Sequence, residues 1–244
     1  MNGRWVAGVD GCRAGWVVVL GSVYTAQHCA YVVPHFQAVV ALGQELGVIA
    51  VDVPIGLLST AKKGGRDCEV RARALLGQRG SSVFSSPTRA ALAVFRRGGT
   101  YQQVAAANRG GNATAPGLSR QTYGIMSKIA EVDALLIGNP ALRNIVYEVH
   151  PELCFREANG GTPMTASKKT RDGQTAREML LQTLGFRRPL HLLGPRLPPK
   201  VSADDLLDAC IACWTAKRIA AGSAIIMPNP PPVDARGLRM ALWR

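Results

Sequence analysis

Acidic residues and long apolar runs are both scarce in this sequence. Only 16 Asp and Glu residues stand against 29 Lys and Arg residues, which gives a net charge of +13 at pH 7. No run approaches the roughly 18 consecutive apolar residues that a membrane helix needs. The longest apolar runs, such as Val17 to Leu20 and Val48 to Val51, have the length of buried strands. The N-terminus has no apolar signal region, so we expect a cytoplasmic protein.

Paired cysteines are almost absent as well. Only Cys210 and Cys213 form a C-x-x-C pair, and this pair lies within a helical pattern. A zinc ribbon needs two such pairs, and a redox pair usually opens a helix. We therefore interpret all six cysteines as small buried or half-buried residues in a reducing compartment. A phosphate-binding Gly-x4-Gly-Lys-Ser/Thr loop is also missing.

The order of the expected elements predicts one α/β domain spanning residues 1–244. Alternating and apolar segments predict three antiparallel strands, then a helix, and then a buried strand in the parallel position that follows a crossover. A helical, Arg-rich insertion covers about residues 62–139, between the fourth and fifth strands. We thus expect a mixed sheet with helices on both faces. The expected strands are 4–9, 16–20, 24–33, 48–51 and 144–149, and the main helices are 36–46, 174–184 and 204–221.

The few acidic residues gather where strands end and where the last long helix begins. Asp10 follows the first strand, Asp52 the fourth, and Glu148 lies near the end of the fifth. Asp205 and Asp208 are three residues apart, so both can face one site on that helix. Carboxylates so placed repel one another unless a cation compensates them, and Mg²⁺ takes carboxylates together with waters and phosphate. The pattern predicts a Mg²⁺ or Mn²⁺ site.

Each acid alone has an ordinary explanation as a turn or capping residue, but their combination favours the metal site. Glu152 competes with Glu148 as the additional ligand. We favour Glu148, because Pro151 is expected to start a helix that carries Glu152 along its first turn. His150 is either a general base or metal neighbour, or an ordinary structural residue.

The basic residues cluster in the insertion, where they predict a polyanionic partner, namely DNA or RNA. The alternative explanation is a compositional bias toward Arg without functional meaning. Aromatic residues are few in this region, so extensive base stacking is not indicated. The candidate nucleic-acid contacts are Arg66, Arg71, Arg89 and Lys128.

Several motifs resemble known families. The segment Asp205-Leu-Leu-Asp208-Ala209 is similar to the D-x-x-D-A helix of Holliday-junction resolvases, a branch of the RNase H-like superfamily. The whole chain resembles the domain-of-unknown-function family 429, which is predicted to contain RNase H-like nucleases. The matching segments are Val9 to Trp16, Val51 to Gly56, Arg66 to Glu69, Ser81 to Pro87, Gly124 to Lys128, Tyr147 to Glu152 and Asp204 to Ala209.

This resemblance implies an RNase H-like fold and a two-metal nuclease. Asp10 matches the first-strand acid, Asp52 the fourth-strand acid, and Asp208, with Asp205 as its partner, the acid of the late helix. Glu148 has no certain counterpart and is expected to be an added ligand. The expected metal ligands are therefore Asp10, Asp52, Glu148 and Asp208, with Asp205 auxiliary.

Three other functions stay open. A phosphotransferase of the actin-like ATPase and sugar-kinase group shares the expected sheet topology, but such enzymes need two copies of the fold. A non-catalytic nucleic-acid-binding protein gains nothing from a buried acidic cluster. A hydrolase of a small phosphorylated molecule would use the same carboxylates.

Overall fold

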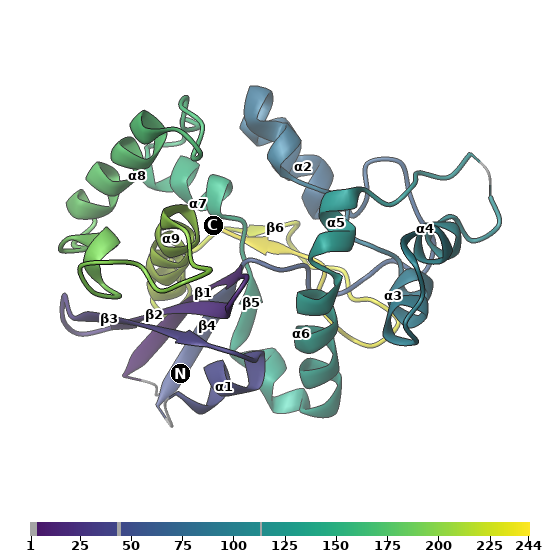
Figure 1. Cartoon of the computed structure of the whole chain (residues 1–244), viewed down its shortest axis with the longest axis horizontal. Helices are drawn as coiled ribbons and strands as arrows, with labels where there is room; N and C mark the ends of the chain where they lie inside the picture. The colour runs from purple at the N-terminus through teal and green to yellow at the C-terminus, as the bar shows by residue number, and fades with distance from the viewer. Residues whose placement is uncertain (1–3, 43–44, 113) are drawn as a thin grey trace. The chain divides into compact units, whose positions relative to one another are not determined.

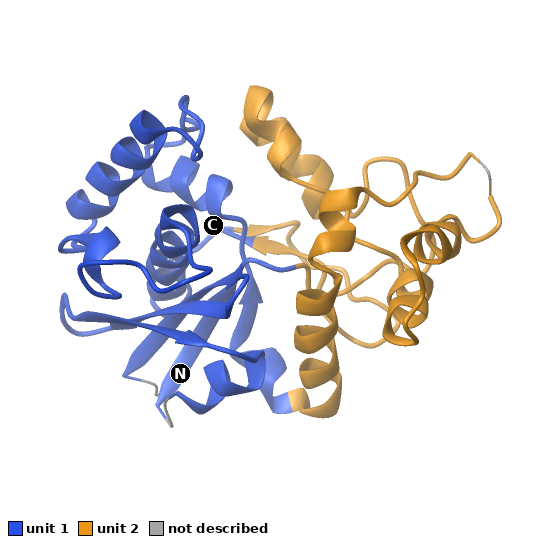
Figure 2. Ribbon diagram, in the orientation of Figure 1, with its two compact units in different colours: residues 1–53, 141–225, 243–244 blue, residues 54–140, 226–242 orange. Residues whose placement is uncertain are grey.

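A computed structural model describes residues 4–42, 45–112 and 114–244 (Figure 1). The chain divides into two compact units (Figure 2): unit 1 comprises residues 1–53, 141–225 and 243–244, and unit 2 comprises residues 54–140 and 226–242. The expected helical insertion lies wholly within unit 2, together with residues 226–242. Folding of the whole chain as one domain stays a prediction.

Unit 1 is built on a five-stranded mixed sheet of order β3-β2-β1-β4-β5. The first three strands form an antiparallel meander, β4 pairs parallel with β1, and β5 pairs parallel with β4. This confirms the predicted α/β class and is consistent with an RNase H-like fold. The strands are β1 Trp5–Cys12, β2 Gly15–Ser22, β3 His28–Val33, β4 Leu46–Val51 and β5 Val146–Glu148.

The first hairpin is tighter than the sequence predicts. β1 continues to Cys12, so Asp10 is a strand residue that pairs with Val17, and only Arg13 and Ala14 make the turn. Gly15 starts β2 with a φ of +133°, in the region that favours glycine. The pairing therefore fixes the position of Asp10 in the sheet.

Helices cover both faces of this sheet, as predicted. Helix α9 contacts β1, β2 and β4, whereas α1 packs on β2 and β3, where Trp16 and Phe36 meet edge to face at 5.1 Å. Ser202 caps α9, because its hydroxyl accepts from the backbone N–H of Asp205. Helices α7 and α8 pack against α9 (Figure 1). The helices of unit 1 are α1 Phe36–Ala41, α7 Pro151–Ala158, α8 Arg171–Thr183 and α9 Ala203–Ala220.

Unit 2 is largely helical. Arg66, at the N-cap of α2, and Arg89, the first residue of α3, form internal ion pairs with acidic residues. Near the C-terminus of the chain, two short strands, β6 and β7, pair with each other. Among the described residues, no helix is both long and apolar enough to cross a membrane. The elements are α2 Asp67–Leu76, α3 Arg89–Arg96, α4 Tyr101–Arg109, α5 Arg120–Gly124, α6 Met126–Gly138, β6 Ile226–Met227 and β7 Leu242–Trp243, whose second residue belongs to unit 1.

Candidate active site

Helix α9 lies directly against β1, because β1 has a glycine where the two elements meet. A Cβ atom on Gly8 would lie 2.0 Å from the backbone nitrogen of Cys213 and 2.2 Å from the carbonyl oxygen of Ala209. Asp10 is two residues beyond Gly8 and therefore points to the same face of the sheet. The close approach brings Asp208, on α9, to Asp10, and both side chains are buried.

Asp52 joins them through strand pairing. Val9 of β1 and Val51 of β4 are partners in the parallel register, and the backbone N–H of Asp52 donates to the carbonyl of Val9 at 3.0 Å. The next residue along each strand, Asp10 on β1 and Asp52 after β4, therefore lies at the same edge of the sheet. Three separate elements thus supply one carboxylate each.

The pKa values of these aspartates reflect their proximity. Burial raises the pKa of Asp10 well above its ordinary value, and repulsion from Asp52 and then Asp208 raises it further. Burial also raises the pKa values of Asp52 and Asp208 to about 6 each, although Lys168 partly opposes both shifts. Such strongly perturbed carboxyl groups are typical of functional sites.

The positive charge at this cluster belongs to Lys168, which the sequence analysis did not identify. Its Nζ lies 2.5 Å from Oδ2 of Asp208, and its side chain is 32% exposed. Burial lowers the pKa of Lys168, but attraction to Asp208, and then to Asp10 and Asp52, outweighs this effect and raises it. Lys168 is therefore positively charged at neutral pH. We refer to Asp10, Asp52, Asp208 and Lys168 as the acidic site.

The loop between α7 and α8 holds Lys168 in this place. Nη1 of Arg177, on α8, donates to the carbonyl of Ala166 at 3.0 Å. The loop also approaches α8 very closely at Gly173, where a Cβ atom would lie 1.9 Å from the carbonyl oxygen of Ser167. The two residues before Lys168 are thus fixed to α8 through their backbone.

Glu152 positions Arg177. Nη2 of Arg177 donates to both carboxylate oxygens of Glu152, at 2.8 and 3.0 Å, and the two side chains are 1% and 4% exposed. Pro151 does start a helix, as expected, and Glu152 lies in its first turn. Its charge contributes to the raised pKa values of Asp52 and Asp208. Glu152 therefore acts on the acidic site in two ways, by its negative charge and by holding Arg177 in place.

Glu148 lies in a different direction from the three aspartates. In the register of β5 with β4, Glu148 is the partner of Val51. Successive side chains of a strand point to opposite faces, so Glu148 shares the face of Val51 and not the face of Asp52. The structure does not bring Glu148 into the acidic site.

Asp205 lies at the edge of the acidic site and has a second task. Its carboxylate accepts from the backbone N–H of Ser202 at 2.8 Å and so completes a capping box at the start of α9. Its charge nevertheless adds to the raised pKa of Asp10. His150 is half-buried and takes the N-cap position of α7.

The donor set of the acidic site fits a hard divalent cation, because carboxylate oxygens are the ligands that Mg²⁺ and Mn²⁺ prefer. In this structure, however, no group of three or more His, Cys, Asp or Glu side chains in residues 4–42, 45–112 and 114–244 is arranged to hold a metal ion. Metal binding by Asp10, Asp52 and Asp208 therefore requires these side chains to rearrange.

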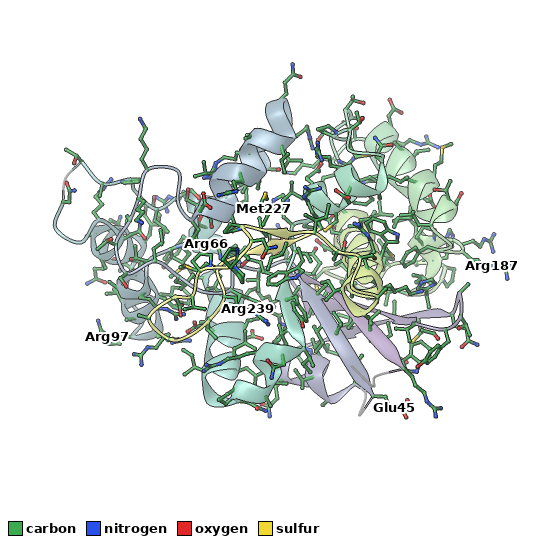
Figure 3. The ribbon with its side chains drawn as sticks, turned by 180° about the vertical axis from the view of Figure 1, so that it is seen from behind. Glu45, Arg66, Arg97, Arg187, Met227 and Arg239 are labelled. Carbon is green, nitrogen blue, oxygen red and sulfur yellow. The ribbon has the colours of Figure 1, made fainter. Side chains whose placement is uncertain are left out.

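Two of the predicted nucleic-acid contacts are corrected by the structure. Arg66 is 2% exposed, and its Nε donates to Glu69 at 2.8 Å. Arg89 is 16% exposed and pairs with both Asp133 and Asp234. Their charges are balanced inside unit 2, so Arg66 is unavailable to a polyanion and Arg89 nearly so. Figure 3 shows Arg66 among the packed side chains.

Other basic residues of unit 2 do reach solvent. Arg71 is exposed, although it also pairs with Asp67 at 2.9 Å, and Lys128 is half-exposed on α6. Unit 2 contains fourteen basic and five acidic residues, a surplus of nine positive charges. Arg97 extends away from α3 into solvent (Figure 3). The exposed basic residues are Lys62, Lys63, Arg71, Arg96, Arg97, Arg109, Arg120 and Arg236.

The sheet and the acidic site together define a mixed α/β protein with carboxylates at the adjacent ends of β1 and β4. The chain belongs to the family described as protein of unknown function (DUF429), whose model matches residues 8–233. This confirms the predicted family, whose description names no activity. No curated protein and no solved structure matches the chain.

Proposed function

We propose that this chain is a divalent-metal-dependent nuclease that hydrolyses phosphodiester bonds of DNA or RNA. The observation that carries the proposal is the convergence of Asp10, Asp52 and Asp208, from three separate elements, on one place in unit 1. Burial of like charges destabilises a fold, so stability alone does not favour this arrangement. A function that needs closely spaced carboxylates accounts for it.

Asp10, Asp52 and Asp208 would hold Mg²⁺ or Mn²⁺. Such an ion supplies a bound water of lowered pKa and positive charge for the leaving oxygen. The protein contributes rigid placement of the backbone that carries these side chains, since strand pairing fixes Asp10 and Asp52, and the packing of α9 on Gly8 fixes Asp208. Asp205 has an auxiliary electrostatic role beside Asp10.

The charge of unit 2 favours a polymeric substrate over a small phosphorylated molecule. Its nine surplus positive charges suit the regularly spaced phosphates of a nucleic acid. A small phosphoester needs only the few cations next to the site. The proposal includes a cytoplasmic location and a relation to the RNase H-like superfamily.

The test is cleavage of a panel of single- and double-stranded DNA and RNA, an RNA–DNA hybrid and a four-way junction. Each substrate is incubated with Mn²⁺, Mg²⁺ or EDTA. We expect metal-dependent cleavage that Asp10→Asn and Asp208→Asn abolish. The control is Asp172→Asn, which removes an exposed carboxylate of α8 and should cleave normally. Metal binding without cleavage of any polymer would refute the nuclease and favour a small phosphoester or a binding role.

A further inference from the structure

We propose that Lys168 is a built-in counter-ion of the acidic site and that it competes with the divalent cation for Asp208. The inference rests on the proposed function, because it assumes that the acidic site takes such an ion. Nζ of Lys168 lies 2.5 Å from Oδ2 of Asp208, whose side chain is 2% exposed. The ammonium group of Lys168 therefore already contacts a carboxylate oxygen of Asp208, the residue that α9 contributes to the site.

The position of Lys168 is a built feature of unit 1. The chain that precedes it is anchored to α8 by Arg177, and Arg177 is in turn held by the two hydrogen bonds that it donates to the buried carboxylate of Glu152. The next residue, Lys169, is exposed to solvent. Two adjacent lysines thus have different environments, because the anchored loop directs only Lys168 to Asp208.

Charge explains why the fold needs a cation here. Three carboxylates in one largely buried place repel one another, and one ammonium group compensates part of that repulsion. A magnesium ion binds carboxylate oxygen at about 2.0–2.1 Å, so an ion on Asp208 would lie only a few ångströms from the ammonium group of Lys168. The two cations repel each other at that separation and share the negative charge of one carboxylate. The presence of Lys168 therefore lowers the apparent metal affinity.

Removal of Lys168 should accordingly tighten metal binding. The experiment titrates Mn²⁺ into the metal-free full-length protein by isothermal calorimetry, for the wild type, Lys168→Met and Lys169→Met. Lys168→Met keeps the length of the side chain without its charge. We expect its Kd to fall about tenfold or more, as the loss of one close charge at a partly buried site implies. Lys169→Met, the matched control, should bind like the wild type.

Lys168→Arg retains a positive charge and should bind Mn²⁺ more weakly than Lys168→Met. Lys168→Gln is the second uncharged variant, and circular dichroism checks the fold of all variants. If the wild type binds Mn²⁺ and the uncharged variants bind it equally or more weakly, Lys168 does not compete with the metal, but the proposed function still stands. If only the uncharged variants bind Mn²⁺, the competition is supported most strongly. Absence of binding in every variant would overturn both.

Discussion

The buried pair between Arg177 and Glu152 gives a sharp prediction about stability. Arg177→Met keeps much of the apolar volume of the side chain but removes the guanidinium group. Glu152, whose side chain is 4% exposed, is then left without the partner that donates to both of its oxygens. Removal of one partner from a buried ion pair strands the other charge away from water.

The expected loss in free energy of unfolding is large. Breaking a buried pair of this kind costs about 3–5 kcal/mol. Arg177 also loses its hydrogen bonds to the carbonyls of Ala166 and Gly173, at 3.0 Å each. The matched control is Arg71→Met, which breaks the exposed pair with Asp67 within α2. An exposed helix pair of this kind contributes only about 0.3–0.5 kcal/mol.

Urea unfolding followed by circular dichroism measures both variants. Addition of Glu152→Gln to Arg177→Met should recover part of the loss, because the stranded charge is then gone, and the double-mutant cycle gives the coupling energy. Loss of less than about 1 kcal/mol in Arg177→Met, close to the control, would show that Glu152 is not held as a buried charge. The interaction of Arg177 with Glu152 would then contribute too little free energy to hold the loop that carries Lys168.

Two further predictions concern the acidic site, one concerns the packing of the Lys168 loop on α8, and one concerns unit 2. In EDTA, Asp52 stabilises the fold below pH 4, and this contribution is lost as pH rises through its folded pKa of about 6. The free energy of unfolding of Asp52→Asn should therefore rise by on the order of 2–3 kcal/mol relative to that of the wild type between pH 4 and 7, measured by urea unfolding. If the difference between the two proteins is the same at both pH values, the pKa of Asp52 is not raised. Mn²⁺ should raise the Tm of the wild type in scanning calorimetry but not that of Asp208→Asn. Gly173→Ala should cost about 1–3 kcal/mol in chemical unfolding, because its Cβ meets the carbonyl oxygen of Ser167. Arg97→Glu should weaken binding to duplex DNA and reduce its salt dependence in fluorescence anisotropy, and an unchanged slope would place the contact elsewhere.

The sheet could be predicted because its signals are local. Alternating and apolar segments marked the five strands, although β1 continues three residues beyond the predicted Val9. The helix predicted at residues 36–46 ends at Ala41, and Leu46 already belongs to β4. Strand pairing decided these boundaries, and pairing depends on residues distant in sequence.

The convergence of Asp10, Asp52 and Asp208 followed from the expected order of strands, and the structure brings these three together. Glu148 was misplaced because sequence position gives the end of a strand but not its register. A shift of one residue turns a side chain to the other face. Arg66 was assigned to a nucleic-acid surface because it lies in the Arg-rich insertion, and only the structure shows that Arg66 and its partner Glu69 are both buried.

Lys168 could not be predicted, because nothing in its neighbourhood distinguishes it from Lys169. What selects it is a pair of close approaches made possible by glycine. Gly8 lets α9 lie against β1 and so fixes Asp208, and Gly173 lets the loop lie against α8 and so fixes Lys168. A side chain at either glycine would separate the elements that carry the two charges. The acidic site is therefore specified by residues without side chains as much as by its charged ones.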